Sequence, residues 1–311
     1  MILGLVFSKD RALQLDACLA SFDRQVPDAA EVQLVVLYSA SSARFQRQYE
    51  ELARWYDGKA RFQPEERFRT HVLEVLRTAR RSGSESTRPF SFSRIWGNAW
   101  PPAVSPEGSA DCVLFLVDDT LFVRPLKLAS VQAALQANPD ALGFSLRLGR
   151  NTTHCYVLDR QQQLPRFQSI GSGMLKYKWP NADGDFGYPL EISSSLYRLS
   201  SIVGVMAGLS FTDPNTLESE MALRARRFSR SMPFMLCPDS SVAFSAPVNR
   251  VQEVYENRAG TNPEWSTESL AGKFDLGLRI DVATLDGFVP SACHQEVELS
   301  LESKRAQNAS R

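Results

Sequence analysis

The chain has 311 residues, of which 43% are hydrophobic and 23% charged, so it can bury the core of one large α/β domain or two smaller domains. Its 35 basic and 35 acidic residues give a formal net charge of zero, which excludes a global positive field that would bind nucleic acid. No apolar stretch is long enough to span a bilayer, and the first basic residues follow the first apolar segment, the wrong order for a secretory signal. We therefore expect a cytoplasmic protein with at most peripheral contact with the inner face of a membrane.

Strands and helices alternate through the first third of the chain. Short apolar runs predict strands over Ile2–Phe7, Val32–Tyr38 and Ala60–Gln63. Apolar residues at helical spacing predict helices that contain residues 15–22, 45–56 and 65–80. This alternation favours an α/β fold with a mostly parallel central sheet.

The remaining elements are less regular. Residues 82–108 and 161–188 are predicted to be loops, a helix contains residues 131–135, and Asp213-Pro214-Asn215 caps a further helix. Strands are predicted over residues 113–117, 141–148, 153–158, 190–197, 242–248 and 297–301. We predict a catalytic domain at 1–250, a smaller irregular C-terminal extension that closes the site at 251–303, and a disordered tail at 304–311. The five scattered cysteines form no C-x-x-C pair and are expected to be buried thiols.

Two adjacent acids end the strand at residues 113–117. The continuous apolar run from Val113 to Val117 is typical of a strand buried on both faces. Asp118 and Asp119 would then lie at its carboxyl end, where open α/β sheets bind ligands. Two adjacent carboxylates repel each other, and a bound cation relieves that repulsion. A haloacid-dehalogenase-type phosphatase is excluded, because its nucleophilic Asp would stand at Leu116.

Several short stretches occur in the order found in one enzyme family. They are Phe7-Ser8-Lys9-Asp10-Arg11, Val117-Asp118-Asp119, the strand 190–197 with the apolar stretch to 211, and Leu217-Glu218-Ser219-Glu220. With these stretches, residues 1–250 resemble metal-dependent glycosyltransferases of the GT-A fold, and most closely the inverting family 2 type. The resemblance implies a GT-A-like three-layer sandwich. It departs from the family pattern at Val117, the first position of the Asp-x-Asp motif, and at Tyr38-Ser39, where an acid usually reads the base.

The resemblance implies roles on the donor side of the reaction. Asp119 would bind Mn²⁺ or Mg²⁺, Asp118 would support the nucleotide, and His294 would return from the C-terminal part to the metal. Lys9 and Arg11, at a strand-to-helix turn, can meet phosphates. The predicted nucleotide-binding residues are Phe7, Ser8, Lys9, Asp10, Arg11, Tyr38, Ser39 and Asp118.

An inverting transfer also needs a general base beside the acceptor hydroxyl. The family's Glu-Asp pair is replaced by Glu218-Ser219, which leaves either Glu218 or Glu220 as the base. Position along the chain suggests acceptor contacts at Arg147, Asp185, Tyr188, Asn249 and Arg250.

The function predicted from the sequence is metal-dependent transfer of a sugar from a nucleotide-diphosphate sugar to a hydroxyl acceptor, with inversion, in glycan or polysaccharide biosynthesis. The acceptor would be a glycan, a lipid-linked molecule or another hydroxyl compound. A sugar-nucleotide nucleotidyltransferase is an alternative, although Ser8-Lys9-Asp10-Arg11 lacks the glycines of its phosphate loop. The second alternative function is that of a non-catalytic nucleotide-sugar-binding protein with the same fold.

Overall fold

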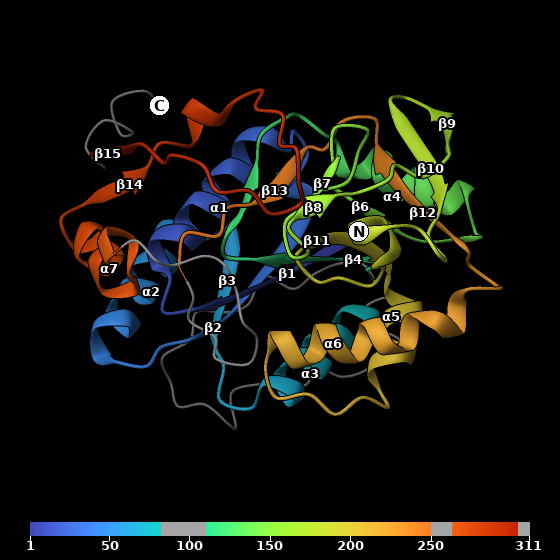
Figure 1. The fold of residues 1–311 in the computed structure, drawn as a ribbon. Helices are drawn as coiled ribbons and strands as arrows, with labels where there is room; N and C mark the ends of the chain where they lie inside the picture. Colours follow the sequence, from blue (N-terminus) through green and yellow to red (C-terminus); the bar gives the residue numbers. More distant parts are fainter. Residues whose placement is uncertain (82–109, 250–262, 304–311) are drawn as a thin grey trace.

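A nine-stranded sheet forms the middle of three layers, with helices on both faces (Figure 1). The computed structural model describes residues 1–81, 110–249 and 263–303. The predicted loop at 82–108 and the predicted tail at 304–311 therefore lie outside the described residues. In spatial order the strands are β3 (Ala60–Pro64), β2 (Val32–Ser39), β1 (Ile2–Lys9), β4 (Cys112–Val117), β11 (Ser194–Arg198), β6 (Ala141–Ser145), β12 (Phe234–Pro238), β10 (Met174–Lys178) and β9 (Phe167–Gly171).

The first half of the sheet is parallel. β1 pairs with β2 and with β4, and β2 pairs with β3, all in parallel register. Helices α1 (Ala12–Gln25), α2 (Ala43–Trp55) and α3 (Phe68–Arg81) follow the first three strands. In the second half, β11 and β10 run opposite to their neighbours. The predicted α/β class with a mostly parallel central sheet is thus confirmed.

The two faces of the sheet bury separate apolar clusters. Along β1, Ile2 and Val6 pack on the side of α1, α2 and α4 (Leu128–Ala137), whereas Leu3, Leu5 and Phe7 pack on the other side. That other side is covered by α3, α5 (Leu199–Met206) and α6 (Pro214–Ala225), as Figure 1 shows. Successive side chains of a strand point to opposite faces, so a strand covered on both faces must be apolar throughout.

Local chemistry sets the start of α6. The side chain of Asp213 accepts hydrogen bonds from the backbone N–H groups of Asn215 and Thr216, and Pro214 occupies the first helical turn. Capping by Asp satisfies backbone donors that a helix start otherwise leaves unpaired. The cap predicted from the sequence is therefore present, and it puts Glu218 in the second helical turn.

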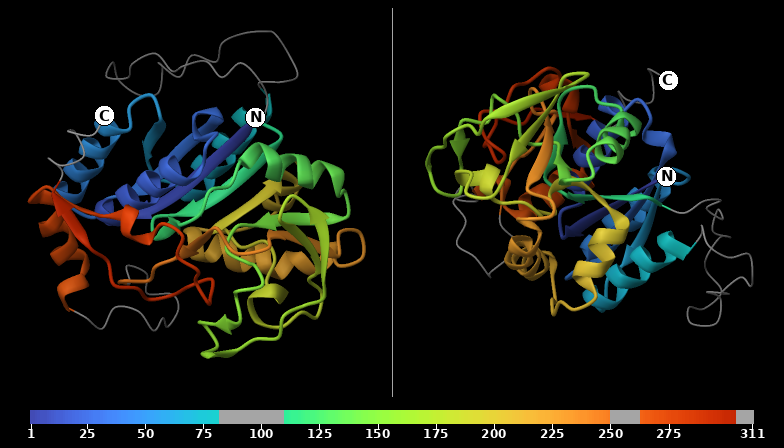
Figure 2. Two further views of the ribbon diagram at one scale, coloured as in Figure 1. Left: turned by 90° about the horizontal axis from the view of Figure 1, so that it is seen from above. Right: turned by 90° about the vertical axis from the view of Figure 1, so that its right-hand side faces the viewer.

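The C-terminal part of the chain packs on the helices of the first half and on the end of β4 that carries the acids. Helix α7 (Thr267–Asp275) packs on α1 and α2, and β14 (Leu278–Ile280) pairs with β15 (Leu301–Ser303) (Figure 2). β5 (Thr120–Phe122) begins directly after the two acids that follow β4, and it pairs with β13 (Ala243–Ser245). An isolated bridge joins Ser245 to His294. The chain from 263 to 303 therefore reaches both the helical layer and the acidic strand end.

Several sequence predictions in the middle of the chain are wrong. The predicted strand 153–158 contains only the two-residue β7 (His154–Cys155), which pairs with β8 (Arg160–Gln161), and the rest is turn. The predicted loop 161–188 contains the hairpin of β9 and β10, and β12, α5 and α7 were not predicted. Edge hairpins and short helices depend on neighbours that local periodicity does not reveal.

Among the described residues, no helix is both long and apolar enough to cross a membrane. All five cysteines are buried and free, as expected from their spacing.

Candidate active site

The ends of three parallel strands meet at one edge of the sheet. Residues 8–11 close β1, Tyr38 lies at the end of β2, and Asp118-Asp119 follows β4. The register places Phe7 beside Val117 and the end of β1 beside Tyr38. Ligands of open α/β sheets bind at this edge. The structure therefore brings together the residues that the sequence placed on the nucleotide side.

Asp118 is held by the end of β1. Its Oδ2 accepts hydrogen bonds from Ser8 Oγ at 2.9 Å and from the Lys9 N–H at 3.4 Å. Its Oδ1 accepts from Arg11 Nη1 at 3.1 Å, and its own N–H donates to the Phe7 carbonyl at 3.1 Å. Burial raises the pKa of Asp118, while the charge of Arg11 lowers it. These contacts leave the carboxylate little freedom to move.

Asp119 has different surroundings. Its Oδ2 lies 3.7 Å from Arg11 Nη1, whereas its Oδ1 is buried and has no hydrogen-bond partner among the described residues. Burial raises the pKa of Asp119 to about 6; Arg11 opposes this shift and the neighbouring Asp118 adds to it. A buried, unpaired carboxylate oxygen costs free energy unless a cation or a donor meets it. Asp119 is therefore the carboxylate that is open to a ligand.

Arg11 connects the two acids to the C-terminal part. Its Nη2 donates a hydrogen bond to the backbone carbonyl of Asn249. The Asn249 side chain in turn accepts from Gln14 Nε2 at 3.2 Å and donates to the Trp265 carbonyl at 3.0 Å. Asn249 is thus buried against the nucleotide side of the site and not beside Arg147. Arg250, the other predicted acceptor residue of this stretch, lies outside the described residues.

The aromatic residues at the strand ends pack inward. Phe7 is 3% exposed, and its ring lies 5.2 Å from the ring of Phe68 and 6.2 Å from that of Phe115. Tyr38 stacks on Tyr49 with ring centroids 4.4 Å apart. Both rings, predicted from the sequence to bind the nucleotide, are therefore buried in this structure, because neighbouring side chains cover them.

Lys9 and Asp10 differ in their surroundings. Lys9 is exposed at the end of β1. Asp10 is buried in a left-handed backbone conformation, with φ of 56°, and its Oδ1 accepts from the Ser41 N–H at 2.7 Å. Its N–H donates to the Ser39 carbonyl at 3.2 Å. Asp10 thus joins the turns after β1 and β2, a tie that supports the shape of the site.

A second charged cluster lies beyond β4. The buried Arg147 donates to Glu191 Oε2 at 3.0 Å, to Ser245 Oγ at 3.2 Å and contacts His294 Nε2 at 3.2 Å. Glu191 raises the pKa of Arg147 although burial alone would lower it. Burial and the nearby Arg147 charge lower the pKa of His294 to about 3. His294 is therefore neutral at pH 7 and can accept a hydrogen bond from Arg147.

The two candidate bases face different groups. Glu218 Oε2 accepts a hydrogen bond from the Ile192 N–H at 3.0 Å, and burial together with the charge of Glu191 raises the pKa of Glu218. Glu220 lies 3.8 Å from Arg224 one helical turn later. A raised pKa brings a carboxylate closer to what a general base needs at neutral pH. Glu218 is thus the candidate that belongs to the charged cluster.

Asp185 and Tyr188 lie at the same cluster. Asp185 accepts from Cys155 Sγ at 3.6 Å and from Gln162 Nε2 at 3.3 Å, and burial raises its pKa while Arg147 lowers it. Tyr188 is 43% exposed and its hydrogen bond lowers the pKa of Glu218. The charge of Arg147 acts on both Asp185 and Glu218, and Tyr188 acts on Glu218, so the predicted acceptor contacts Arg147, Asp185 and Tyr188 belong to one cluster.

The fit of a divalent cation rests on Asp119. The described residues contain no group of three or more His, Cys, Asp or Glu side chains arranged to hold a metal ion. Asp119 Oδ1 is a free carboxylate oxygen of the kind that Mn²⁺ and Mg²⁺ prefer. His294 meets Arg147 through Nε2, while its buried Nδ1 has no partner in the described part of the chain. One protein carboxylate plus substrate phosphates is a usual ligand set for such ions.

Two important residues were missed from the sequence. Glu191 is buried and pairs with Arg147, and Tyr49 bonds both Ser8 Oγ at 2.7 Å and the Arg11 N–H at 3.1 Å. A signal for Glu191 was present, since it is one acid inside the apolar stretch 190–197. Tyr49 carried no such signal, because an aromatic at helical spacing predicts core packing.

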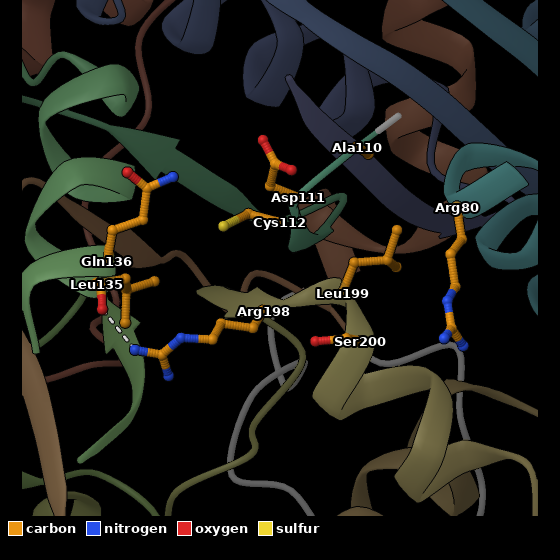
Figure 3. Close-up of a pocket in the computed structure, with 9 residues that line it drawn as sticks. All are labelled: Arg80, Ala110, Asp111, Cys112, Leu135, Gln136, Arg198, Leu199 and Ser200. Carbon is orange, nitrogen blue, oxygen red and sulfur yellow. Dashed lines mark hydrogen bonds between the residues drawn. The ribbon is translucent and has the colours of Figure 1, made fainter. Parts of the chain in front are cut away.

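A separate cavity of about 240 Å³ lies at the opposite end of β4 (Figure 3). Asp111 and Cys112 lie in its centre, between α4 and the start of α5. Arg198 points across it and donates to the carbonyls of Leu135 and Ala141. The arginine is thus bound by backbone carbonyls, and the cavity lies at the end of β4 opposite the two acids.

The strand order and the acids at the end of β4 define an open α/β sheet with a charged strand end, the fold class expected from the sequence. No family model matches the chain. It is similar to the bifunctional glycosyltransferase pgtA of Dictyostelium discoideum, with 25% identity in an alignment of 279 positions that covers 81% of this chain and 32% of that protein. The match confirms the predicted resemblance to glycosyltransferases. The chain spans about a third of the length of this curated relative.

Solved structures with some likeness include two with bound nucleotide sugars. S. aureus TarS 1-349 in complex with UDP-GlcNAc has 13% identity and a TM-score of 0.45, covering 81% of this chain and 60% of that one. The mannosyltransferase PcManGT from Pyrobaculum calidifontis, with GDP-Man and Mn²⁺, has 14% identity and a TM-score of 0.43, covering 80% and 58%. Both scores are below 0.5, and the assignment of the fold rests on the strand topology.

Proposed function

We propose that this chain transfers a sugar from a nucleotide-diphosphate sugar to an acceptor hydroxyl, using a divalent cation and with inversion. The observation that carries the proposal is the division of labour among the buried carboxylates. Asp118 is saturated with hydrogen bonds, Asp119 keeps an unpaired oxygen, and Glu218 belongs to a separate cluster. Donor binding and acceptor deprotonation need carboxylates in such different surroundings.

On the donor side, Asp119 would hold Mn²⁺ or Mg²⁺ through Oδ1, with His294 as the second candidate ligand. When bound, the cation supplies the positive charge that neutralises a diphosphate leaving group. Asp118, fixed by Ser8 and Arg11, would support the nucleotide. The nucleotide side of the proposal comprises Phe7, Ser8, Lys9, Asp10, Arg11, Tyr38, Ser39 and Asp118.

On the acceptor side, Glu218 would accept the proton of the attacking hydroxyl. Its pKa is raised by burial and by Glu191, which makes it a stronger base than an exposed carboxylate. Attack by a deprotonated hydroxyl on the face opposite the nucleotide inverts the anomeric carbon. Glu220 stays the alternative base, and the proposed acceptor contacts are Arg147, Asp185, Tyr188 and Arg250.

The wider setting is also part of the proposal. Free, buried cysteines are typical of proteins from a reducing compartment, which supports a cytoplasmic enzyme of glycan or polysaccharide biosynthesis. The exposed residues Arg226, Arg227 and Arg230 follow α6 and could meet anionic headgroups, which supports at most peripheral contact with a membrane. Residues 1–250 would form the catalytic unit, with 251–303 as an extension that supplies His294.

The test is turnover of a panel of nucleotide-diphosphate sugars with Mn²⁺, with and without EDTA, after thermal-shift screening has identified the donors that bind. We expect hydrolysis or transfer that EDTA abolishes. The variant Asp119→Asn should lower this activity at least roughly 100-fold, because the negative charge that attracts the cation is lost. Binding of a nucleotide sugar without any turnover would contradict the proposal and favour a non-catalytic binding protein.

Asp111→Asn provides the matched control. Asp111 lies at the other end of the same strand, where it pairs with the N-terminal amine at 3.3 Å. This variant removes one carboxylate from β4 without touching the acidic strand end, so its activity should equal that of the unaltered protein. Equal losses in both variants would mean that the effect of Asp119→Asn comes from damage to the fold.

A further inference from the structure

We propose that Glu191 is a positioning residue, which fixes the proposed base Glu218 and the acceptor-side Arg147 in one rigid arrangement. This inference rests on the proposed function, because it assigns a purpose to Glu191 only if Glu218 acts as the base. Glu191 itself is 5% exposed and would touch neither donor nor acceptor.

Every oxygen of the Glu191 side chain is in use. Oε2 accepts from Arg147 Nη2 at 3.0 Å, from the Ser194 N–H at 3.2 Å and from the Ser193 N–H at 2.5 Å. Oε1 accepts from Ser195 Oγ. A carboxylate with this many donors is fixed in direction, and it fixes the guanidinium that it holds.

The backbone of Glu191 connects this cluster to the base. The Tyr197 hydroxyl donates to the Glu191 carbonyl at 2.8 Å, and the following N–H, that of Ile192, donates to Glu218 Oε2 at 3.0 Å. Both ends of the peptide between Glu191 and Ile192 are therefore hydrogen-bonded. The Ile192 N–H that orients Glu218 belongs to the same peptide group as the Glu191 carbonyl, and the Glu191 side chain binds Arg147.

Arg147 extends the arrangement to the C-terminal part. Its Nη1 reaches Ser245 Oγ and His294 Nε2, both at 3.2 Å, while its Nη2 reaches Glu191. Without the Glu191 charge, this buried guanidinium would lose the acid that it bonds directly and be free to turn toward Glu218. The base would then be partly neutralised by an ion pair.

The charges around Glu218 make the idea testable by pH. Glu191 and Arg147 face it with opposite charge, and Tyr188 and Tyr197 are the other titratable groups that act on or near it. Helix α5, which packs against α6, has no titratable side chain. Removing the Glu191 charge removes a repulsion and leaves the attraction of Arg147, so the pKa of Glu218 must fall.

The experiment compares Glu191→Gln with Glu191→Asp at saturating Mn²⁺ and donor. For Glu191→Gln we expect kcat to fall roughly 10- to 100-fold, as for other residues that orient a reacting group, with KM for the donor within about twofold. The acidic limb of the kcat profile should move to lower pH. Glu191→Asp keeps the charge, so its limb should stay in place. An unmoved limb and unchanged kcat in Glu191→Gln would overturn the proposal.

Two more variants keep the outcomes distinct. If Glu218→Gln retains full transfer, the proposed base is wrong; if it abolishes transfer while Glu191→Gln behaves like the unaltered protein, only the positioning role fails. Should Glu191→Gln not fold, Ser195→Ala removes one hydrogen bond to Glu191 and keeps the charge pair. A lowered kcat with unchanged donor KM then supports the role, and an unchanged kcat overturns it.

Discussion

Arg147 and Arg279 are both buried arginines with carboxylate partners, yet their surroundings differ. Arg279 is fully buried under α1 and α2, with its guanidinium 3.6 Å above the ring of Phe274. It donates to the carbonyls of Phe274 and Leu278 and to Glu51 Oε1 at 3.1 Å, and its Nε lies 3.6 Å from Asp16 Oδ2. Rings and carbonyls therefore hold it as much as acids do.

Arg147, by contrast, is surrounded by more negative groups than one guanidinium can neutralise. Glu191, Glu218 and Asp185 all raise its pKa, and burial and Glu191 in turn raise the pKa of Glu218. Arg279 anchors the fold, whereas a reaction site can keep carboxylates whose proton affinity is raised. Burial of an ion pair therefore does not by itself indicate a site; buried carboxylates beside it with raised pKa values do.

The largest expected effect tests the cluster around Arg147. Glu218→Gln should lower kcat roughly 100- to 10,000-fold, because the general base is lost, while the unfolding midpoint stays near its original value. Glu220→Gln, two residues away and paired with Arg224, is the matched control and should retain activity. Reversed results, measured as transfer rates at saturating donor, would move the base to Glu220.

For Arg279 we expect the opposite result, a loss of stability without a loss of activity. Arg279→Met should lower the free energy of unfolding by about 3 kcal/mol, because the buried Asp16 loses its counter-ion, and leave kcat per folded molecule unchanged. Urea unfolding and active-site-normalised rates measure the two quantities. The exposed pair of Arg24 with Asp286 supplies the control, since Arg24→Met should cost less than about 1 kcal/mol. A selective loss of kcat in Arg279→Met would erase the distinction.

A smaller effect concerns metal affinity and pH. With the pKa of Asp119 at about 6, a proton competes with the cation below that pH. Titration of Mn²⁺ should therefore show affinity that is level above about pH 7 and falls about tenfold per pH unit below the pKa. Constant affinity across this range would argue against Asp119 as the ligand. Asp119→Asn, in which nothing titrates there, should bind Mn²⁺ weakly at every pH.

The last prediction concerns how stability depends on pH when EDTA keeps the protein free of metal. The pKa of His294 is lowered to about 3 in the fold from its ordinary value of 6.5, so between these values the unfolded chain binds a proton that the folded chain does not. Stability contributed by His294 should therefore fall as the pH drops from 6.5. Asp119, with a raised pKa, acts in the opposite direction between about pH 6 and 3.8. His294→Gln should consequently flatten the acidic loss of stability seen in urea unfolding.

The first half of the sheet could be predicted because its signals are local. β1, β2 and β4 are covered on both faces, which requires continuous apolar runs, and the acids after β4 interrupt such a run abruptly. The hairpin of β9 and β10 could not be predicted in this way. Its edge strand alternates weakly, and its turn at Ser172-Gly173 uses positive φ values that any glycine-containing loop can adopt.

The sequence by itself determined which strands are buried, where Asp118 and Asp119 lie on them, and where the cap at Asp213 begins α6. Only the tertiary structure decided that Glu191 pairs with Arg147, 44 residues away, and that His294 reaches the same arginine across 147 residues. It also decided that Glu218, and not Glu220, faces this cluster. Periodicity and capping are set by neighbours in the chain, whereas the pairing of distant charges depends on how the layers pack.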